Sequence, residues 1–361
     1  MNDLTQFHAG DLDEISTNPS ANTHFAEILQ VALKRRDFLK GGLGASALGF
    51  LGGATALLQG NNAEAATFAG VPLGFSSVPL AGNDTVVVPD GYRVQVLYAW
   101  GDPIGKAGLP AGMPAWSGDA SETAEAQAQQ AGAHHDGMSL FPFPTAAGPS
   151  NTHALLAMNH EYVDQGLLFS DGMSNWDLEK VRKSQAAHGV SIIEIKHDGQ
   201  AWNVVRPSLY ARRITSNTPL VFSGPAVSIT GSAGFGTLNN CAAGPTPWGT
   251  YLTCEENFNN YFGAKAGDPN GKPTNDPLFV PNAAEKRYGI NAAGGGYHWH
   301  HYDPRFDLNT GLGRAEANKF GWVVEIDPYN PKAAPVKRTA LGRFKHEGAT
   351  YAIAADGRVV I

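Results

Sequence analysis

The chain is short of charged residues, and this shortage limits the partners it can bind. Lys, Arg, Asp and Glu make up 16% of the 361 residues, against about 25% in an ordinary globular chain. Acidic residues outnumber basic ones by 33 to 26, which gives a formal net charge of −7. A general nucleic-acid binder is therefore excluded, because no basic field is present to neutralise phosphates. Hydrophobic residues still make up 42% of the chain, enough for a sizeable core, so wholesale disorder is excluded as well.

Three motifs that indicate common enzyme classes are also missing. No G-x-S-x-G sequence is present, so a serine hydrolase lacks its nucleophile turn. Gly294-Gly295-Gly296 is followed by Tyr-His-Trp rather than by a helical pattern, which argues against a nucleotide-binding loop. His298, His300 and His301 resemble a zinc cluster, but they are a weaker candidate because the helical H-E-x-x-H arrangement is absent.

Glycine is abundant instead, with 43 residues of 361, against a usual share of about 7%. This excess favours tight turns between short strands. The expected strands lie at 84–98 with an internal Pro-Asp-Gly turn, and at 153–158, 189–196, 201–205, 249–254, 321–326 and 349–361. Asp-Gly hairpin tips and the lack of a long amphipathic helix predict an all-β fold of antiparallel blades, a β-propeller, with a β-sandwich as the alternative. Two long irregular segments, 101–135 and 258–288, are expected to be functional loops.

The N-terminal region is typical of an export address. A basic pair with Phe-Leu-Lys and the uncharged run 41–58 resemble a twin-arginine signal, and Ala63-Glu64-Ala65 supplies a cleavage pattern. The residues that carry the signal are Arg35, Arg36, Phe38, Leu39 and Lys40. The uncharged run just reaches membrane-spanning length, but its many glycines and alanines favour a cleaved signal over an anchor. We therefore expect residues 1–65 to be a signal read by the twin-arginine translocase, and the mature protein to be periplasmic or secreted.

Both cysteines lie in one segment, Cys241 and Cys254, on either side of a Pro/Gly-rich turn. In an exported protein this spacing is typical of a disulfide, and the alternative is a thiolate that ligates a metal. Glu255 and Glu256 follow directly, and adjacent carboxylates at a strand end are costly unless solvent or a cation neutralises them. Neighbouring strand side chains point to opposite faces, so one site takes both only if the strand bends there. Together with Asn257, they suit calcium or another hard cation.

Other segments place carboxylates beside expected strands. Glu161 follows the strand 153–158 in Asn159-His160-Glu161-Tyr162 and is a candidate metal ligand, with a solvated surface Glu as the alternative. In the segment 342–350, Arg343 and Lys345 could bind a phosphate and Glu347 could ligate a metal. The alternative there is a charged turn between strands. Asp136 lies in a further candidate ligand loop of low specificity.

Together these segments resemble the PhoX-type alkaline phosphatases, an exported family. The resemblance rests on the Arg-Arg-Asp-Phe-Leu-Lys leader, Asp136-Gly137-Met138 before Phe141-Pro142, Asn159-His160-Glu161-Tyr162, Asn240-Cys241 through Trp248-Gly249-Thr250 to Cys254-Glu255-Glu256-Asn257, and His346-Glu347-Gly348-Ala349. The block from Cys241 to Asn257 is the most specific of these. The resemblance covers the chain from about residue 85 to its end.

The resemblance implies a six-bladed β-propeller that holds Fe3+ and Ca2+ at its central funnel and hydrolyses phosphate monoesters outside the cytoplasm. Carried over by residue, Cys241 is an iron thiolate ligand and Glu347 an iron ligand. Glu161 and the pair Glu255 and Glu256 are candidates for calcium or for bridging. A cysteine that binds iron cannot also pair with Cys254, so the resemblance favours free thiols.

Members of that family are considerably longer. We therefore expect residues 66–361 to be the N-terminal portion of an incomplete propeller that is monomeric and, by itself, metal-poor and inactive. Two other functions stay open at this point. One is a non-catalytic exported propeller that binds a ligand or partner, because fold does not fix function. The other is a calcium-dependent lactonase or esterase on a similar propeller.

Overall fold

The computed structural model describes residues 75–80, 82, 84–264 and 279–361. The expected signal residues at 35–40 lie outside this part of the chain. The chain divides into two units, Met1–Val94 and Gln95–Ile361. In the first unit the Pro-Asp-Gly turn is present, since the Tyr92 amide donates to the Pro89 carbonyl at 3.0 Å. The strands predicted on either side of that turn, within 84–98, are wrong, because these described residues form bends and irregular segments and belong to no strand.

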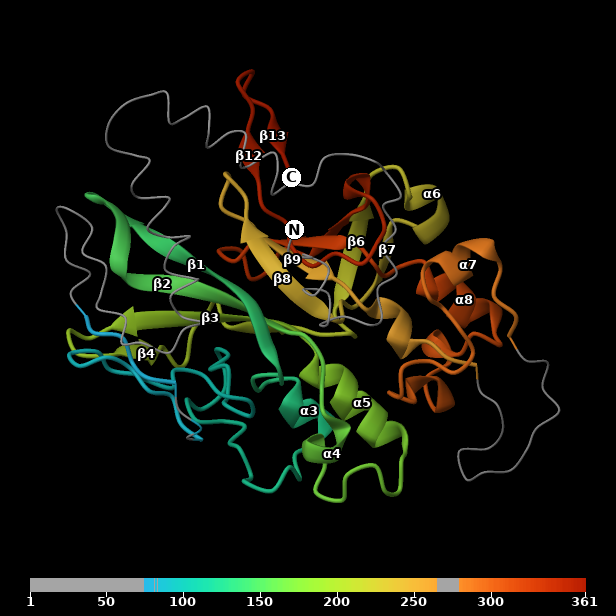
Figure 1. Ribbon diagram of the computed structural model, residues 1–361, viewed down its shortest axis with the longest axis horizontal. Coiled ribbons are helices and arrows are strands. Elements are labelled where there is room, and N and C mark those ends of the chain that lie inside the picture. The colour runs from blue at the N-terminus through green and yellow to red at the C-terminus, as the bar shows by residue number, and fades with distance from the viewer. Residues whose placement is uncertain (1–74, 81, 83, 265–278) are drawn as a thin grey trace, which may run out of the picture. The chain divides into compact units, whose positions relative to one another are not determined.

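The second unit contains a five-stranded antiparallel sheet (Figure 1). Its strands are β1 (His135–Thr145), β2 (Gly148–His160), β3 (Gly189–His197), β4 (Trp202–Val204) and β5 (Arg212–Ile214), in the order β1-β2-β3-β4 with β5 also pairing with β3. At one end of the β1–β2 pair, His135 lies opposite His160. This register brings the start of β1 and the end of β2 together, and with them Asp136 and Glu161.

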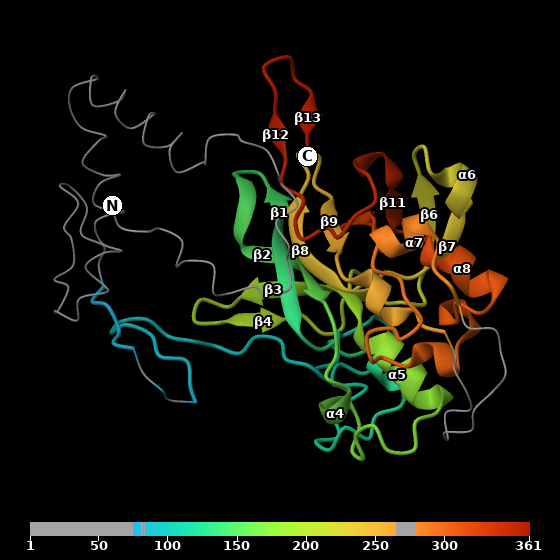
Figure 2. The same ribbon diagram turned by 45° about the vertical axis from the view of Figure 1, so that its right-hand side comes forward.

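The same unit contains a six-stranded sheet in the order β7-β6-β11-β10-β9-β8. Its strands are β6 (Pro219–Ser223), β7 (Ala233–Phe235), β8 (Asn240–Pro245), β9 (Tyr251–Glu255), β10 (Val323–Ile326) and β11 (Val336–Arg338), and only β6 and β11 pair in parallel. A separate hairpin, β12 (Ala352–Ile353) with β13 (Val359–Val360), extends away from both sheets in Figures 1 and 2.

Short helices lie between and beside the sheets. They are α3 (Ala124–Gln127), α4 (Gln165–Leu168), α5 (Leu178–Ala187), α6 (Val227–Thr230), α7 (Ala283–Arg287) and α8 (Gly311–Ala317), with 3-10 turns η2 (Phe258–Tyr261), η3 (Trp299–His301), η4 (Pro304–Phe306) and η5 (Thr339–Leu341). The longest, α5, begins after Asp177, whose side chain accepts from the Lys180 amide as an N-cap. Among the described residues, no helix is long and apolar enough to cross a membrane.

The second half of β2 is buried on both faces and joins two hydrophobic clusters. Leu155 and Ala157 pack with Val190, Ile192 and Tyr251. Alternate residues of the same strand, Ala154, Leu156 and Met158, pack with a different cluster that includes Ile193 and Tyr98. Because side chains alternate along a strand, an uninterrupted apolar run is stable only where both faces are covered. The end of β2, which carries Asn159 and His160, is therefore held rigidly in the interior.

Most of the predicted strands are confirmed. The segments 153–158, 189–196, 201–205, 249–254, 321–326 and 349–361 all contain strands, and the Asp-Gly hairpins at 198–199 and 356–357 join the expected partners. Strand β1 was not predicted, because it carries two prolines, Pro142 and Pro144, and a register shift lies between them. Helix α5 was not predicted either. The β-propeller stays a prediction.

Candidate metal centre

Five potential ligands gather where the two sheets meet. The ligand atoms of Asp136, Glu161 and Cys241 all lie within 4.8 Å of one another, and so do those of Cys241, Glu256 and Glu347. Cys241 belongs to both groups and therefore joins them. We call these five residues the acidic cluster. They come from the start of β1, the end of β2, β8, the end of β9 and the segment before β12, so the site forms only in the folded chain.

Strand irregularities aim these side chains at one place. The register between β1 and β2 shifts between His135 and Met138, beside Asp136. The register between β8 and β9 shifts between Asn240 and Ala243, which leaves Cys241 in a bulge. Bulges re-aim side chains and are common next to functional sites. Gly137 permits a close approach of β1 to β8, since a Cβ at this position would lie 2.7 Å from the Ala242 carbonyl carbon.

Asn159 fixes the backbone that carries the thiol. Its side-chain amide donates to the carbonyls of Cys241 and of Ala242, the latter at 3.3 Å. Its side-chain oxygen accepts from the hydroxyls of Tyr251 and Thr253, both at 2.8 Å. Asn159 is fully buried, so these bonds tie the end of β2 to both β8 and β9. The motif containing Asn159 was noted in the sequence, but this positioning role was not.

The remaining two ligands are held by contacts with the same strands. The Glu256 main-chain amide donates a hydrogen bond of 3.0 Å to the main-chain carbonyl of Asn239. Asn239 has a positive φ of 48°. The segment that carries Glu347 packs along β8, because a Cβ on Gly244 would lie 1.9 Å from the Ala349 carbonyl oxygen. The His346 amide donates to the Glu255 carbonyl at 3.3 Å, which fixes the start of this segment. Glycine at position 244 is therefore required for Glu347 to reach the cluster.

The acidic cluster has an uncompensated negative charge. Burial, followed by the charges of Asp136, Glu256 and Glu347, raises the pKa of Glu161 to about 7. Burial together with a hydrogen bond to Asp136 raises the pKa of the Cys241 thiol. Among the described residues, the ion pairs that Lys and Arg form all involve carboxylates outside this cluster. Raised pKa values of this kind mean that the ionised form is buried without a counter-charge. Carboxylates and a thiolate are also metal donors. These residues therefore fit one or more cations.

Glu255 lies apart from this cluster, so only one of the two adjacent carboxylates named as candidate ligands belongs to it. Its side chain is fully buried on the opposite face of β9 and forms an ion pair of 2.8 Å with Lys337. The amides of Gly321 and Trp322 donate to its other oxygen at 2.9 and 3.1 Å. The strand does not bend enough to bring both side chains together, so the structure gives Glu255 a structural partner rather than a ligand position.

The two predicted phosphate-binding cations differ in their surroundings. Arg343 donates to the carbonyls of Phe320 and Ala317 at 2.8 and 2.6 Å. Its guanidinium lies over the ring of Tyr288, 4.2 Å from the centroid. Arg343 therefore serves packing in this structure. Lys345 is exposed at the surface of the same segment.

The two cysteines are free thiols, so the disulfide alternative is wrong in this structure. Cys254 is fully buried in an apolar cluster with Leu252, Val323 and Ala349. Elsewhere, His298, His300 and His301 place ring nitrogens within 4.8 Å of one another in and beside the turn η3.

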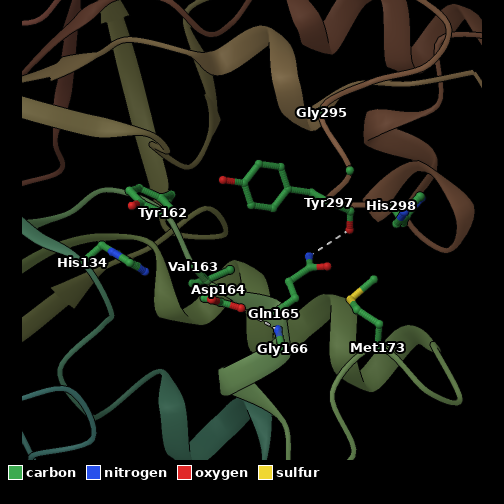
Figure 3. Close-up of a pocket in the computed structure, with 11 residues that line it drawn as sticks. His134, Tyr162, Val163, Asp164, Gln165, Gly166, Met173, Gly295, Tyr297 and His298 are labelled. Carbon is green, nitrogen blue, oxygen red and sulfur yellow. Dashed lines mark hydrogen bonds between the residues drawn. The ribbon is translucent and has the colours of Figure 1, made fainter.

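A pocket of about 570 Å³ lies next to the segment that follows Glu161 (Figure 3). Its lining comes from three places in the chain: His134 before β1, the α4 region after β2, and the loop before η3. The lining residues are His134, Tyr162, Val163, Asp164, Gln165, Gly166, Met173, Gly295, Gly296, Tyr297 and His298. This pocket is hard to predict from the sequence, because residues more than a hundred positions apart form it.

Comparisons with known proteins agree with the motifs. The family model described as alkaline phosphatase PhoX matches residues 73–361, whereas no curated protein matches the chain. Among solved structures, the chain is similar to Pseudomonas fluorescens PhoX in complex with vanadate, a transition state analogue, with 44% sequence identity and a TM-score of 0.71. This match covers 79% of the chain and 47% of that structure, so the chain spans about half the length of the protein it matches. The chain belongs to the PhoX alkaline phosphatase family.

Proposed function

We propose that this chain, in contrast to the expectation that it is metal-poor and inactive by itself, carries a metal centre for the hydrolysis of phosphate monoesters outside the cytoplasm. The observation that carries the proposal is the acidic cluster, in which four carboxylates and a thiol lie together and none of the ion pairs in the described part of the chain involves them. The similar protein was solved with vanadate, described as a transition state analogue. Family membership therefore supports a phosphatase over an unrelated hydrolase.

The donor set supports two kinds of cation. Cys241 offers a soft thiolate, which suits a transition metal such as Fe3+. Asp136, Glu161, Glu256 and Glu347 offer only oxygen, which suits Ca2+. When bound, such cations would polarise the phosphoryl group and neutralise negative charge that develops on it.

The chain's own residues have defined tasks in this proposal. Asn159 holds the Cys241 backbone in the bulge, so the thiol is placed before any metal arrives. Glu161, with a pKa of about 7, holds a proton near neutrality when no cation is present and releases it when one binds. Glu256 approaches Cys241 from the end of β9, the strand next to β8 in the same sheet, and Glu347 approaches it from the segment before β12. The ligands therefore lie on separate segments of the chain, and contacts with the rest of the fold hold each segment in place.

Export and overall architecture are further parts of the proposal. The twin-arginine motif at residues 35–40 supports delivery of an already folded, metal-loaded protein to the periplasm or beyond. The β-propeller implied by the family resemblance would place the cluster at its centre. The two sheets that meet at the cluster are compatible with this placement.

The test is hydrolysis of p-nitrophenyl phosphate by the protein as isolated, after chelation, and after iron and calcium are restored. We expect chelation to abolish hydrolysis and restoration of both metals to recover it. Glu256→Gln should lose most of the activity, whereas Glu125→Gln, on the exposed surface of α3, should retain it. Hydrolysis that survives both chelation and Glu256→Gln would overturn the proposal. Calcium dependence with lactone or carboxylester hydrolysis instead would indicate the lactonase alternative.

A further inference from the structure

The pocket in Figure 3 is attached directly to the acidic cluster. His134 precedes Asp136 by two residues, and Tyr162 follows Glu161. The Glu161 amide donates to the His134 carbonyl at 3.0 Å, so the ligand and the pocket wall share one backbone hydrogen bond. The pocket wall and the acidic cluster are therefore adjacent along two stretches of backbone.

Flat rings form two sides of this pocket. The ring of His134 stacks on that of Tyr162, with centroids 3.8 Å apart and planes 16° from parallel. On the side formed by the loop before η3, Tyr297 stacks on Tyr261 with centroids 4.2 Å apart. Met173 adds a thioether, and both Tyr162 and Met173 are 39% exposed. Aromatic faces and a methionine favour a flat, polarisable ligand group.

The pocket is held in shape by contacts across it. The buried side chain of Gln165 donates to the Tyr297 carbonyl at 3.0 Å, which is the dashed line across the pocket in Figure 3. The Trp176 indole donates to the His298 carbonyl at 3.3 Å. Close packing adds to this, since a Cβ on Gly295 would lie 2.4 Å from that of Asn260. A pocket already ordered in this way loses little conformational entropy on binding.

Its size also fits an organic group. A volume of about 570 Å³ lies within the usual range for small-molecule sites, about 300–1,000 Å³. A phosphate alone would fill only a small part of it. None of the five acidic-cluster residues lines the pocket, so metal binding leaves the space free.

We propose that this pocket binds the leaving-group side of the substrate and selects phosphate monoesters of flat-ring alcohols over those of small aliphatic alcohols. The inference rests on the proposed function, because it assumes that the phosphate end faces the acidic cluster. The ring would lie against Tyr162 and Met173, and the ester oxygen would point toward Glu161. Tyr162 is then a specificity residue rather than a catalytic one.

The experiment measures equilibrium binding of three non-hydrolysable probes to the metal-loaded protein by calorimetry. Inorganic phosphate reports the anion site, methylphosphonate adds a small aliphatic group, and phenylphosphonate adds a flat ring. We expect phenylphosphonate to bind about tenfold more tightly than methylphosphonate, the size of effect that one aromatic stacking contact with its buried area supplies. Tyr162→Ala should reduce this ratio about three- to tenfold, because the exposed stacking face is lost.

Leu167→Ala is the matched control, since Leu167 lies on neighbouring α4, is exposed and does not line this pocket. It should leave the ratio unchanged. If phosphate and methylphosphonate bind but the phenyl group gives no advantage, or if Tyr162→Ala leaves the ratio intact, the pocket assignment is wrong and the proposed function stands. If only phenylphosphonate binds, the proposed function fails, but the assignment of the pocket as a ring-binding site stands. If none of the three binds, both fail.

Discussion

Glu255 and Glu256 are neighbours in the chain, yet the fold treats them in opposite ways. Glu255 is fully buried with an ion pair to Lys337 and two backbone amides. Glu256 points to the other face, where it joins three further carboxylates and a thiol. Where a carboxylate serves the fold, the chain supplies its own cation. Where it does not, no ion pair in the described part of the chain involves the carboxylate, which supports the proposal that a cation binds there.

The largest expected effect lies on the Glu255 side of this comparison. Lys337→Met should lower the free energy of unfolding by about 3–5 kcal/mol, because it leaves a buried carboxylate without its partner. Urea unfolding of the metal-free chain measures this loss. The matched change at the acidic cluster, Glu256→Gln, should not lower the free energy of unfolding by a comparable amount. A loss below about 1 kcal/mol for Lys337→Met would show that the ion pair is not the main support of Glu255.

Asn159 connects the structural interior to the acidic cluster, so its loss should affect both. Asn159→Ala should cost about 2–3 kcal/mol, since two buried hydroxyls lose their acceptor and two carbonyls lose their donor. It should also weaken metal binding about 10- to 100-fold, as expected when a group that orients a ligand is removed. Asn203→Ala, at an exposed position on β4, is the control. Normal metal affinity in a destabilised Asn159→Ala chain would refute the positioning role.

The pH dependence of stability should reveal the uncompensated charge. The pKa of Glu161 is raised from 4.5 to about 7, so the folded chain keeps a proton that the unfolded chain has released. Stability of the metal-free chain should therefore fall as pH rises from about 4.5 through 7, by on the order of 1 kcal/mol after solvent screening. Thermal unfolding from pH 5 to 8 measures this slope. Glu161→Gln should flatten it, and a slope unchanged by that substitution would contradict the assignment.

The smallest expected effect is a slight gain in stability rather than a loss. In the metal-free chain, Glu256→Gln should leave stability unchanged or raise it by less than about 1 kcal/mol, because one of several like charges is removed. Glu255→Gln should instead be destabilising, because it weakens a buried ion pair. The difference between these two variants in urea unfolding measures the contrast between the two faces of β9. Equal losses would mean that both carboxylates are structural.

The motifs predicted candidate ligands that the fold brings together, but not which of two neighbouring carboxylates joins them. Asp136, Glu161, Cys241, Glu256 and Glu347 were all singled out from the sequence, and the structure brings them together. Alternation along a strand sends Glu255 and Glu256 to opposite faces, but the sequence could not say which face holds Lys337. That depends on the pairing of β10 and β11, which lie some seventy and eighty residues further along the chain.

The fold was predictable where local signals were strong. Asp-Gly turns and β-branched runs marked β3, β4, β12 and β13 correctly. The segment 84–98 has the same local pattern but finds no partner strand, because pairing depends on distant residues. The pocket beside Glu161 was missed for the same reason, since Tyr162 and Tyr297 come together only in three dimensions.

The most direct test of the central claim is the metal content of the purified chain and of two cysteine variants. The free thiols Cys241 and Cys254 differ in their surroundings, one in the acidic cluster and one in an apolar core. After incubation with iron and calcium and removal of excess metal, elemental analysis should find both metals in the parent chain and in Cys254→Ala. Cys241→Ser should lose iron and its thiolate-to-iron absorption band. Iron retained by Cys241→Ser, or a parent chain that binds no metal, would contradict the account.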